Sequence, residues 1–326
     1  MGEHLMNDAA VMADLEHGGA DRVSVLDLYD RWEAQHWQIQ HLDIAGDISA
    51  WRSMNRYFRV AAIAAMARFS EGEMAVTETL APIAYAAPVA EYRLYLSTQI
   101  ADEARHALFF RKYLAALCDN DLTTDSDISA YRAGTLFDEA LARVTDRVRS
   151  HPGDIPSWYE AVVVYHLLVE GTVAMTGLHA LLRMTREFPA LAALHTGLMG
   201  VARDESRHVN FGMLALRSGV RTGFANDIVD ALTRHLPVAA ETMVDPYTED
   251  RTPRLPLLAA RRAEELRERW QFAESTLARR LPSLGLPEQT VQSLVHLWRE
   301  GCAHAVATYQ EVHGHTHPAS YKPIFG

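Results

Sequence analysis

Two short stretches of this sequence pair a glutamate with a histidine at a spacing that suits a metal ion. Residues 102–106 and 204–208 share the frame Asp-Glu-x-Arg-His. On an α-helix, side chains three positions apart lie on one face, so each glutamate and its histidine can reach a common ion. The side chains concerned are Glu103, His106, Glu205 and His208. The repeated frame predicts two helical hairpins related by approximate symmetry.

A two-metal site in a helical bundle needs one further glutamate from each of the two remaining helices. Glu73 lies upstream of Glu103, and Glu170 lies upstream of Glu205. Both sit among small or apolar residues, and a buried carboxylate without a partner costs several kcal/mol. Each therefore implies a cation, an ion pair or a raised pKa. The predicted ligands of two metal ions are Glu73, Glu103, His106, Glu170, Glu205 and His208.

Other residues compete for these positions. Glu71 and Glu78 lie close to Glu73, and spacing alone does not exclude Glu71. Three further histidines are interpreted as structural or surface residues: His166, His179 and His195.

Oxygen-rich ligation with one imidazole per metal favours iron or manganese over copper, and it contains too many carboxylates for a structural zinc. Cys118 and Cys302 are too few and too far apart in the sequence to form a thiolate site or a disulfide framework. The sequence therefore predicts a centre built from oxygen and nitrogen ligands that can bind and cleave dioxygen.

The elements that must position these residues are all predicted to be helices. Helical spacing of apolar residues covers residues 57–80, ending at Pro82, and then 88–117, 128–149, 156–187 and 190–217. Residues 119–129 are predicted to be a loop, and three more helical stretches follow residue 219. No segment shows sustained two-residue alternation. The prediction is an all-α, ferritin-like four-helix bundle core with additional peripheral helices.

We expect one domain rather than two. The predicted parts are an N-terminal arm (1–36), a helical domain (37–312) with its metal-binding core at about 55–218 and satellite helices at about 222–312, and a C-terminal tail (313–326).

Composition excludes several classes of protein. The formal charge is −11 and the basic residues are scattered, which argues against nucleic acid as a partner. The sequence shows neither an apolar run of roughly 20 residues nor a secretory signal pattern, so we expect a cytoplasmic protein without a membrane span.

At these residues the sequence resembles the ribonucleotide reductase small-subunit superfamily, and within it the ligand-binding oxidases that carry a manganese/iron centre. The resemblance covers about residues 37–212 and is most specific in residues 72–77, residues 165–171 and the two Asp-Glu-x-Arg-His segments. The ligands it implies, with glutamates bridging, are Glu73, Glu103 and His106 for one metal and Glu170, Glu205 and His208 for the other. It further implies manganese in the first site and iron in the second, and two iron ions are the alternative.

The resemblance also implies an ether cross-link between Val76 and Tyr165. Helical rotation supports Val76, which is three residues after Glu73 and therefore on the metal face. Tyr165 is five residues before Glu170, about 140° away on an ideal helix. By rotation alone His166 is the better neighbour, and only a local helix distortion or the reach of the side chain would bring Tyr165 in.

Four more residues bear on the chemistry. Phe110, seven after Glu103, stands where tyrosyl-radical reductase subunits place their radical tyrosine, and it argues against that chemistry. Trp37 and Asp204 resemble members of the reductase electron-transfer route, with helix packing as the alternative. Asp102 and Asp204 are expected to orient the ligand histidines or to tie neighbouring groups.

The predicted function is that of an enzyme, a dioxygen-dependent di-metal oxidase that oxidises a bound organic substrate by two electrons. The resemblance implies a long-chain fatty acid as a bound ligand, and analogy implies a homodimer. One alternative is a ribonucleotide reductase small subunit, for which the tail is short and has no acidic run. Another is a non-catalytic iron-binding or storage bundle. An arylamine N-oxygenase is disfavoured because Val201 stands where that class has an extra histidine.

Overall fold

A computed structural model describes residues 23–117, 135–249 and 255–321, and within these ranges every regular element is a helix. The all-α, ferritin-like fold predicted from the sequence is confirmed. The elements in chain order are α2 (Val25–Ala34), η1 (Ile39–His41), α3 (Ile44–Ser53), α4 (Arg56–Ala86), α5 (Ala90–Leu117), η2 (Leu136–Leu141), α7 (Ala142–Ser150), α8 (Ile155–Val162), η3 (Val163–Ala174), α9 (Met175–Glu187), α10 (Ala192–Arg221), α11 (Ala225–Val244), α12 (Pro256–Ser283), α13 (Glu288–His313) and η4 (Pro318–Ser320).

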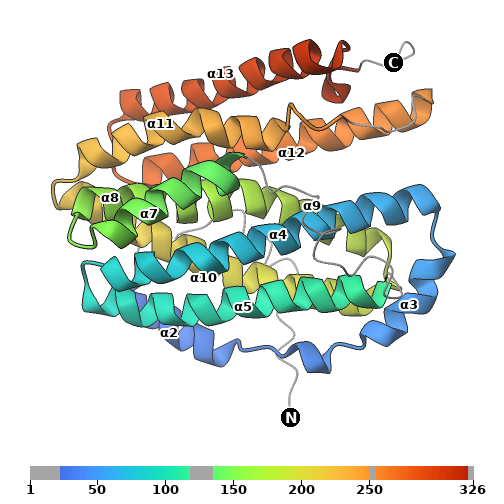
Figure 1. The fold of residues 1–326 in the computed structure, drawn as a ribbon, viewed down its shortest axis with the longest axis horizontal. Helices are drawn as coiled ribbons and strands as arrows, with labels where there is room; N and C mark the ends of the chain where they lie inside the picture. Colours follow the sequence, from blue (N-terminus) through green and yellow to red (C-terminus); the bar gives the residue numbers. More distant parts are fainter. Residues whose placement is uncertain (1–22, 118–134, 250–254, 322–326) are drawn as a thin grey trace.

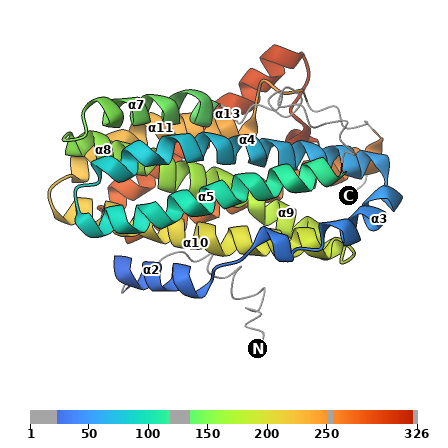
Figure 2. The same cartoon turned by 60° about the horizontal axis from the view of Figure 1, so that its bottom comes forward.

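Four long helical units make the bundle core (Figure 1). They are α4, α5, the continuous helix formed by α8, η3 and α9, and α10. α4 packs along α5, while α10 packs along η3 and α9, which gives two hairpins. α11 covers η3 and is itself covered by α13, and α12 contacts both η3 and α9. On the opposite side of the bundle, α2 and α3 lie against α5 and α10 (Figure 2).

Helix α2 lies within the residues predicted to form the N-terminal arm. It begins at a capping box, in which Ser24 Oγ accepts a hydrogen bond from the Asp27 backbone N–H and Asp27 accepts one from the Ser24 N–H. Two backbone donors at the helix start are thereby satisfied. Val25 and Leu28 are buried, and the helix packs on α5 and α10. The boundary between arm and domain at residue 36 stays a prediction.

Several sequence predictions lie wholly or partly outside the described residues. They concern the first 22 residues of the arm, the loop at 119–129, the start of the helix at 128–149, Cys118, and the end of the tail after residue 321.

The prediction that the first core helix ends at Pro82 is wrong, because α4 continues to Ala86. A proline inside a helix removes one hydrogen bond, here the one to the carbonyl of Glu78. The residues that follow are held by tertiary packing: Ile83 is buried, and its carbonyl accepts a hydrogen bond from Trp158 Nε1 at 2.9 Å. These tertiary contacts stabilise the last turn of α4 after Pro82.

The helix predicted at 156–187 contains an irregular middle, because η3 is π-helical over Val163–Ala174. In a π-helix the N–H bonds the carbonyl five residues back rather than four, so residues five apart share a face. The side chain of Thr172 follows the same register and donates to the Leu167 carbonyl at 2.8 Å. Arg280 of α12 reaches in and donates to the carbonyl of Gly171.

Among the described residues, one helical stretch, Ile155–Glu187, is long and apolar enough by length and composition to cross a membrane. Its most apolar window is 83% buried inside the protein. This stretch is the core helix that contains η3.

Two glycines of α10 allow close approach of its neighbours. A Cβ atom on Gly212 would lie 2.2 Å from the Cβ of His166 on η3, and one on Gly200 would lie 2.7 Å from the indole of Trp37. Only a residue without a side chain fits these contacts, so α10 can lie directly against η3 and against the segment that holds Trp37.

A buried carboxylate fastens α8 to α7 and α11. Glu160 of α8 accepts hydrogen bonds from Arg147 Nη1 at 2.6 Å and from Arg234, and it contacts His235 Nε2 at 2.9 Å. Burial alone would raise the pKa of Glu160, but His235 and the two arginines hold it at about 2. The carboxylate is therefore charged in the folded protein and links three helices.

We expect Glu160→Gln to lower the free energy of unfolding by about 2 kcal/mol, since it removes the charge but leaves the arginines partly desolvated. Because the pKa of Glu160 is lower in the folded state than its ordinary 4.5, the stabilisation is present above pH 4.5 and is lost as the pH falls toward 2. Urea unfolding of the native protein and the variant, from above pH 4.5 down to pH 2, measures this difference in free energy. Glu139→Gln, in an exposed pair with Arg143, is the matched control and should change stability little. If the free energies of unfolding of Glu160→Gln and the native protein differed by the same amount at every pH down to 2, this account would be contradicted.

Candidate metal centre

The six predicted ligands lie together inside the bundle. Glu73 comes from α4, Glu103 and His106 from α5, Glu170 from η3, and Glu205 and His208 from α10. All six side chains are buried. Since the four helices bring donors that are far apart in the sequence to one place, the bundle interior is the only part of the described chain where such a set of donors gathers.

The donors form two groups. In the first, one ligand atom from each residue lies within 4.8 Å of the others, and the residues are Glu73, Glu103, His106 and Glu205. In the second, the same holds for Glu103, Glu170 and His208. Glu103 belongs to both groups.

Both Glu103 and Glu205 face the two imidazoles at once. The oxygens of Glu103 lie 3.4 Å from His106 Nδ1 and 3.2 Å from His208 Nδ1. Those of Glu205 lie 3.4 Å and 3.8 Å from the same two atoms. A carboxylate with one oxygen toward each imidazole has the geometry of a bridge between two ions.

The other two glutamates each face one imidazole. Glu73 Oε2 lies 3.6 Å from His106 Nδ1, and Glu170 Oε1 lies 3.7 Å from His208 Nδ1. They have the geometry of terminal ligands, one at each end of the centre.

The residues fit a pair of metal ions because their inward-facing atoms lack hydrogen-bond partners among the described residues. These atoms are Glu103 Oε2, His106 Nδ1, Glu170 Oε2, Glu205 Oε2 and His208 Nδ1. Buried polar atoms are rarely left unsatisfied, and a cluster of them is accounted for by an ion. Two divalent cations would neutralise the four carboxylates.

Without ions, protons have to neutralise part of this charge. Burial raises the pKa of Glu73 to about 8 and that of Glu170 well above its usual range. Burial alone would lower the pKa of both imidazoles, but Glu73 holds that of His106 well above the usual range and Glu103 does the same for His208. Metal uptake must therefore release protons.

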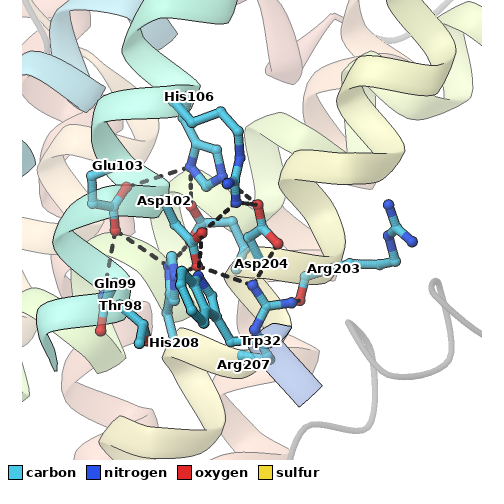
Figure 3. A network of polar contacts seen from close by, with 12 residues as sticks. Trp32, Thr98, Gln99, Asp102, Glu103, His106, Arg203, Asp204, Arg207 and His208 are labelled. Atoms are coloured by element: carbon cyan, nitrogen blue, oxygen red, sulfur yellow. Dashed lines mark hydrogen bonds and ion pairs between the residues drawn. The ribbon is translucent and has the colours of Figure 1, made fainter. Parts of the chain in front are cut away.

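The two aspartates of the repeated frame cross over to the opposite histidine (Figure 3). His106 Nε2 lies 3.1 Å from Asp204 Oδ2, and His208 Nε2 lies 3.2 Å from Asp102 Oδ2. Each carboxylate can accept a hydrogen bond from Nε2–H, which orients the ring so that Nδ1 faces the centre. These contacts have the geometry expected if the aspartates orient the ligand histidines.

The two arginines of the frame tie the aspartates to each other. Arg105 donates to Asp102 and, at 2.8 Å, to Asp204. Arg207 donates to Asp102 at 3.0 Å and to Asp204 at 2.5 Å. Burial alone would raise the pKa of Asp204, but the hydrogen bond with His106 and the charges of Arg207 and Arg105 hold it well below its usual value.

Two indole groups also donate hydrogen bonds to these aspartates. Trp37 Nε1 donates to Asp204 Oδ2 at 2.7 Å, and its ring stacks on His106 with centroids 6.4 Å apart. Trp32 Nε1 donates to Asp102 Oδ1 at 2.9 Å. Sequence reasoning singled out Trp37 and missed Trp32, because nothing in the amphipathic pattern of α2 distinguishes the latter.

Sequence reasoning also missed Gln99, which is fully buried one helical turn before Glu103. Its Nε2 donates to Glu170 at 2.8 Å and to Glu103 at 3.3 Å, and its Oε1 faces His166 Nε2 at 3.2 Å. The available signal was a polar residue four positions before Glu103, on the same face of α5.

The π-helix explains the position of Tyr165. Because residues five apart share a face in η3, Tyr165 and Glu170 both point to the centre, and Tyr165 Oη donates to Glu103 Oε1 at 3.2 Å. The rotation of about 140° between Tyr165 and Glu170 holds for an ideal α-helix and does not apply to the π-helical η3. His166, favoured by that angle, bonds Gln99 instead, and Val76 is buried on α4.

The remaining candidates lie elsewhere. Phe110 is buried and packs on Phe69, with ring centroids 5.4 Å apart. Glu78 is exposed, and Glu71 is partly buried. His179 stacks on Phe272, and His195 Nδ1 contacts Thr185 Oγ1 at 2.8 Å.

Comparison with known proteins agrees with this geometry. The family model described as "Ribonucleotide reductase, small chain" matches residues 21–253, well over half of the sequence. The chain belongs to the ribonucleotide reductase small-chain family. Its membership confirms the resemblance drawn from the sequence.

Solved structures similar to this family member include R2-like ligand-binding oxidases. A valine-to-leucine variant with anaerobically reconstituted Mn/Fe cofactor is 20% identical, with a TM-score of 0.56 over 88% of this chain and 93% of that one. A form with aerobically reconstituted metal cofactor after photoconversion is 21% identical, with the same TM-score and coverage. A glycine-to-leucine variant with Mn/Fe cofactor covers 94% of this chain and 98% of its own, at 20% identity. At this identity the likeness establishes the fold.

Proposed function

We propose that this small-chain family member is a dioxygen-dependent di-metal oxidase, with manganese and iron or two iron ions. The observation that carries the proposal is the buried cluster of four carboxylates and two imidazoles, in which donor atoms of three carboxylates and both imidazoles have no hydrogen-bond partner among the described residues. The Mn/Fe cofactors named for the structural neighbours support the manganese and iron pair. Bound redox metals supply electron transfer and activation of dioxygen.

In this proposal the protein's own residues have distinct roles. Glu103 and Glu205, which each face both imidazoles, would help to hold both ions, and Glu73 and Glu170 would each help to hold one. The imidazoles would bind through Nδ1 because Nε2 is bonded to an aspartate. Burial excludes water from the centre, which favours oxidation of a bound molecule over side reactions.

We propose an aliphatic, fatty-acid-like molecule as the organic ligand. The helices that carry the ligands also carry buried apolar residues such as Val76, Phe110 and Met213, a side-chain type that suits an alkyl chain. The word "ligand-binding" in the names of the neighbours agrees with a bound molecule beside the metals. Extraction of the purified protein followed by lipid mass spectrometry tests it, and a protein with no aliphatic acid bound would contradict it.

We also propose the ether cross-link between Val76 and Tyr165. A C–H bond of Val76 and the O–H bond of Tyr165 are replaced by a C–O bond, and the two protons and two electrons released pass to dioxygen. Support comes from the π-helix, which turns Tyr165 toward the centre, and from the burial of both side chains.

Protein loaded with Mn(II) and Fe(II) and then exposed to air is expected to contain a linked peptide lacking two hydrogens. Peptide mass spectrometry measures it, together with metal analysis of the same sample. Tyr165→Phe should bind both metals and give no linked peptide. Unlinked peptides from fully loaded native protein would exclude the cross-link and leave the two-metal proposal standing.

One observation favours a second candidate, a radical-supplying small subunit. Trp37, Asp204 and His106 form a hydrogen-bonded line from the partly exposed indole to the centre, as such a subunit requires. Turnover of a ribonucleotide by a mixture with a reductase large subunit would establish this function, and no turnover would exclude it.

We further propose a cytoplasmic homodimer. Leu94, Ala101 and Leu108 are exposed and seven residues apart, so they form one stripe on the outer face of α5. A light-scattering mass equal to one chain would contradict the dimer.

A further inference from the structure

A second line of hydrogen bonds runs from the protein surface to the centre, through Trp32. The indole Nε1 donates to Asp102 Oδ1 at 2.9 Å, and Asp102 Oδ2 lies 3.2 Å from His208 Nε2 (Figure 3). We propose that Trp32 is an entry point for single electrons that re-reduce the centre from its His208 side. The inference rests on the proposed oxidase function and adds a route for its reductant.

This line has the same residue types, in the same order, as the one through Trp37. There the indole donates at 2.7 Å to Asp204, which lies 3.1 Å from His106. Each aspartate belongs to one Asp-Glu-x-Arg-His segment and serves the histidine of the other. The approximate symmetry of the frame gives each imidazole its own carboxylate, and each carboxylate accepts a hydrogen bond from one indole outside the frame.

Burial makes the indole the accessible end of the line. Asp102 and His208 are 1% and 0% exposed, whereas Trp32 is only partly buried on α2. A donor at the surface of α2 can therefore approach the Trp32 ring but neither the carboxylate nor the imidazole. Only two hydrogen bonds and the covalent bonds of Asp102 separate that ring from His208.

The Asp102 carboxylate makes Trp32 easier to oxidise than an isolated indole. A negative charge hydrogen-bonded to the indole N–H stabilises the positive charge that appears when an electron leaves the ring. Asp102 is fixed for this purpose by Arg105 and Arg207, which bind its other lone pairs.

The electron balance is simple. In each event an external donor loses one electron and the oxidised centre gains one, and Trp32 is left unchanged. No bond is made or broken, and the indole proton stays on Nε1. Two such events restore the two electrons that one oxidation cycle withdraws from the metals.

The surface around Trp32 indicates the charge of a suitable donor. On α2 the exposed side chains Asp27, Asp30 and Glu33 outnumber the exposed Arg31. A cationic one-electron donor is attracted to this face, and the attraction falls as salt screens it.

The first test measures reduction of the air-oxidised, metal-loaded protein by the methyl viologen radical cation in a stopped-flow instrument. Trp32→Phe removes the hydrogen bond and the oxidisable ring, and it should slow reduction about tenfold or more. Trp270→Phe, a partly buried tryptophan of α12 outside this network, is the matched control and should react at the native rate. Metal content and the spectrum of the oxidised centre should be the same in all three proteins, which a merely structural defect would not allow.

The second test needs no metal in the protein. Flash photolysis of the metal-free chain with the cationic oxidant tris(bipyridine)ruthenium(III) should form an indole radical, and its absorption should fall in Trp32→Phe but not in Trp270→Phe. Equal radical yield in native and Trp32→Phe protein, or equal rates of reduction of their loaded forms, would overturn the proposal. If native protein bound two metals but did not react with dioxygen, the oxidase function would fail, and the radical yield would still report on Trp32.

Discussion

Replacing Glu103 by alanine is expected to reduce the metal content from two ions per chain to one or none and to abolish oxygen consumption. Glu103 is the carboxylate shared by both donor groups, with one oxygen 3.4 Å from His106 Nδ1 and another 3.2 Å from His208 Nδ1. Its removal takes a ligand from each ion at once and leaves the two imidazoles facing each other without the charge between them. Plasma emission analysis and an oxygen electrode measure the two quantities.

The matched control is Glu78→Ala, which removes an exposed glutamate of α4. That variant should keep both ions and full oxygen consumption, and circular dichroism should show that both variants remain helical. Two ions per chain in folded Glu103→Ala protein would contradict the bridging role. The same assay on Glu71→Ala and Glu73→Ala decides between these two neighbours, and we expect a loss of metal only for Glu73→Ala.

Removal of both metals is expected to lower the melting temperature by about 10–20 °C. Each ion bound at about 100 times its Kd stabilises the folded state by about 2.7 kcal/mol, and roughly 2–4 °C of melting temperature follows each kcal/mol. The metal-free bundle must instead hold four buried carboxylates by protonation and by contacts with two imidazoles. Differential scanning calorimetry of chelator-treated and reloaded protein measures the difference.

The specificity of this effect can be checked in two ways. Ca²⁺, which prefers six to eight oxygen ligands, should stabilise the chain less than Mn²⁺ or Fe²⁺, because two of the six donors are imidazoles. Glu103→Ala protein should show little stabilisation by any of these ions. Equal melting temperatures for metal-free and metal-loaded native protein would mean that the cluster does not bind ions in the folded state.

Prediction from the sequence worked best where periodicity and buried charge coincide. The helices that carry the centre were expected near their observed positions, because long runs of apolar residues at helical spacing have no other stable arrangement. The prediction that α4 ends at Pro82 was wrong, since the buried residues after it and the Trp158 hydrogen bond outweigh one lost backbone bond.

Residue spacing was less informative about which donors converge. The Glu-x-x-His spacing occurs a third time at Glu33 and His36, yet both of these side chains are exposed. Spacing places two side chains on one face of a helix but does not say whether that face is inside the bundle. The apolar neighbours of Glu73 and Glu170 supplied that information for the two upstream ligands.

The sequence by itself determined the fold class, the family and a set of six candidate ligands, because these depend on residue type and on local periodicity. Tertiary structure decided three features that local rules cannot express: the crossing of each aspartate to the opposite histidine, the indole of Trp32 behind Asp102, and the turn of Tyr165 toward Glu103. The first two depend on how separate helices pack. The third depends on a π-helical stretch in which residues five apart share a face, whereas an ideal α-helix would point the phenol away.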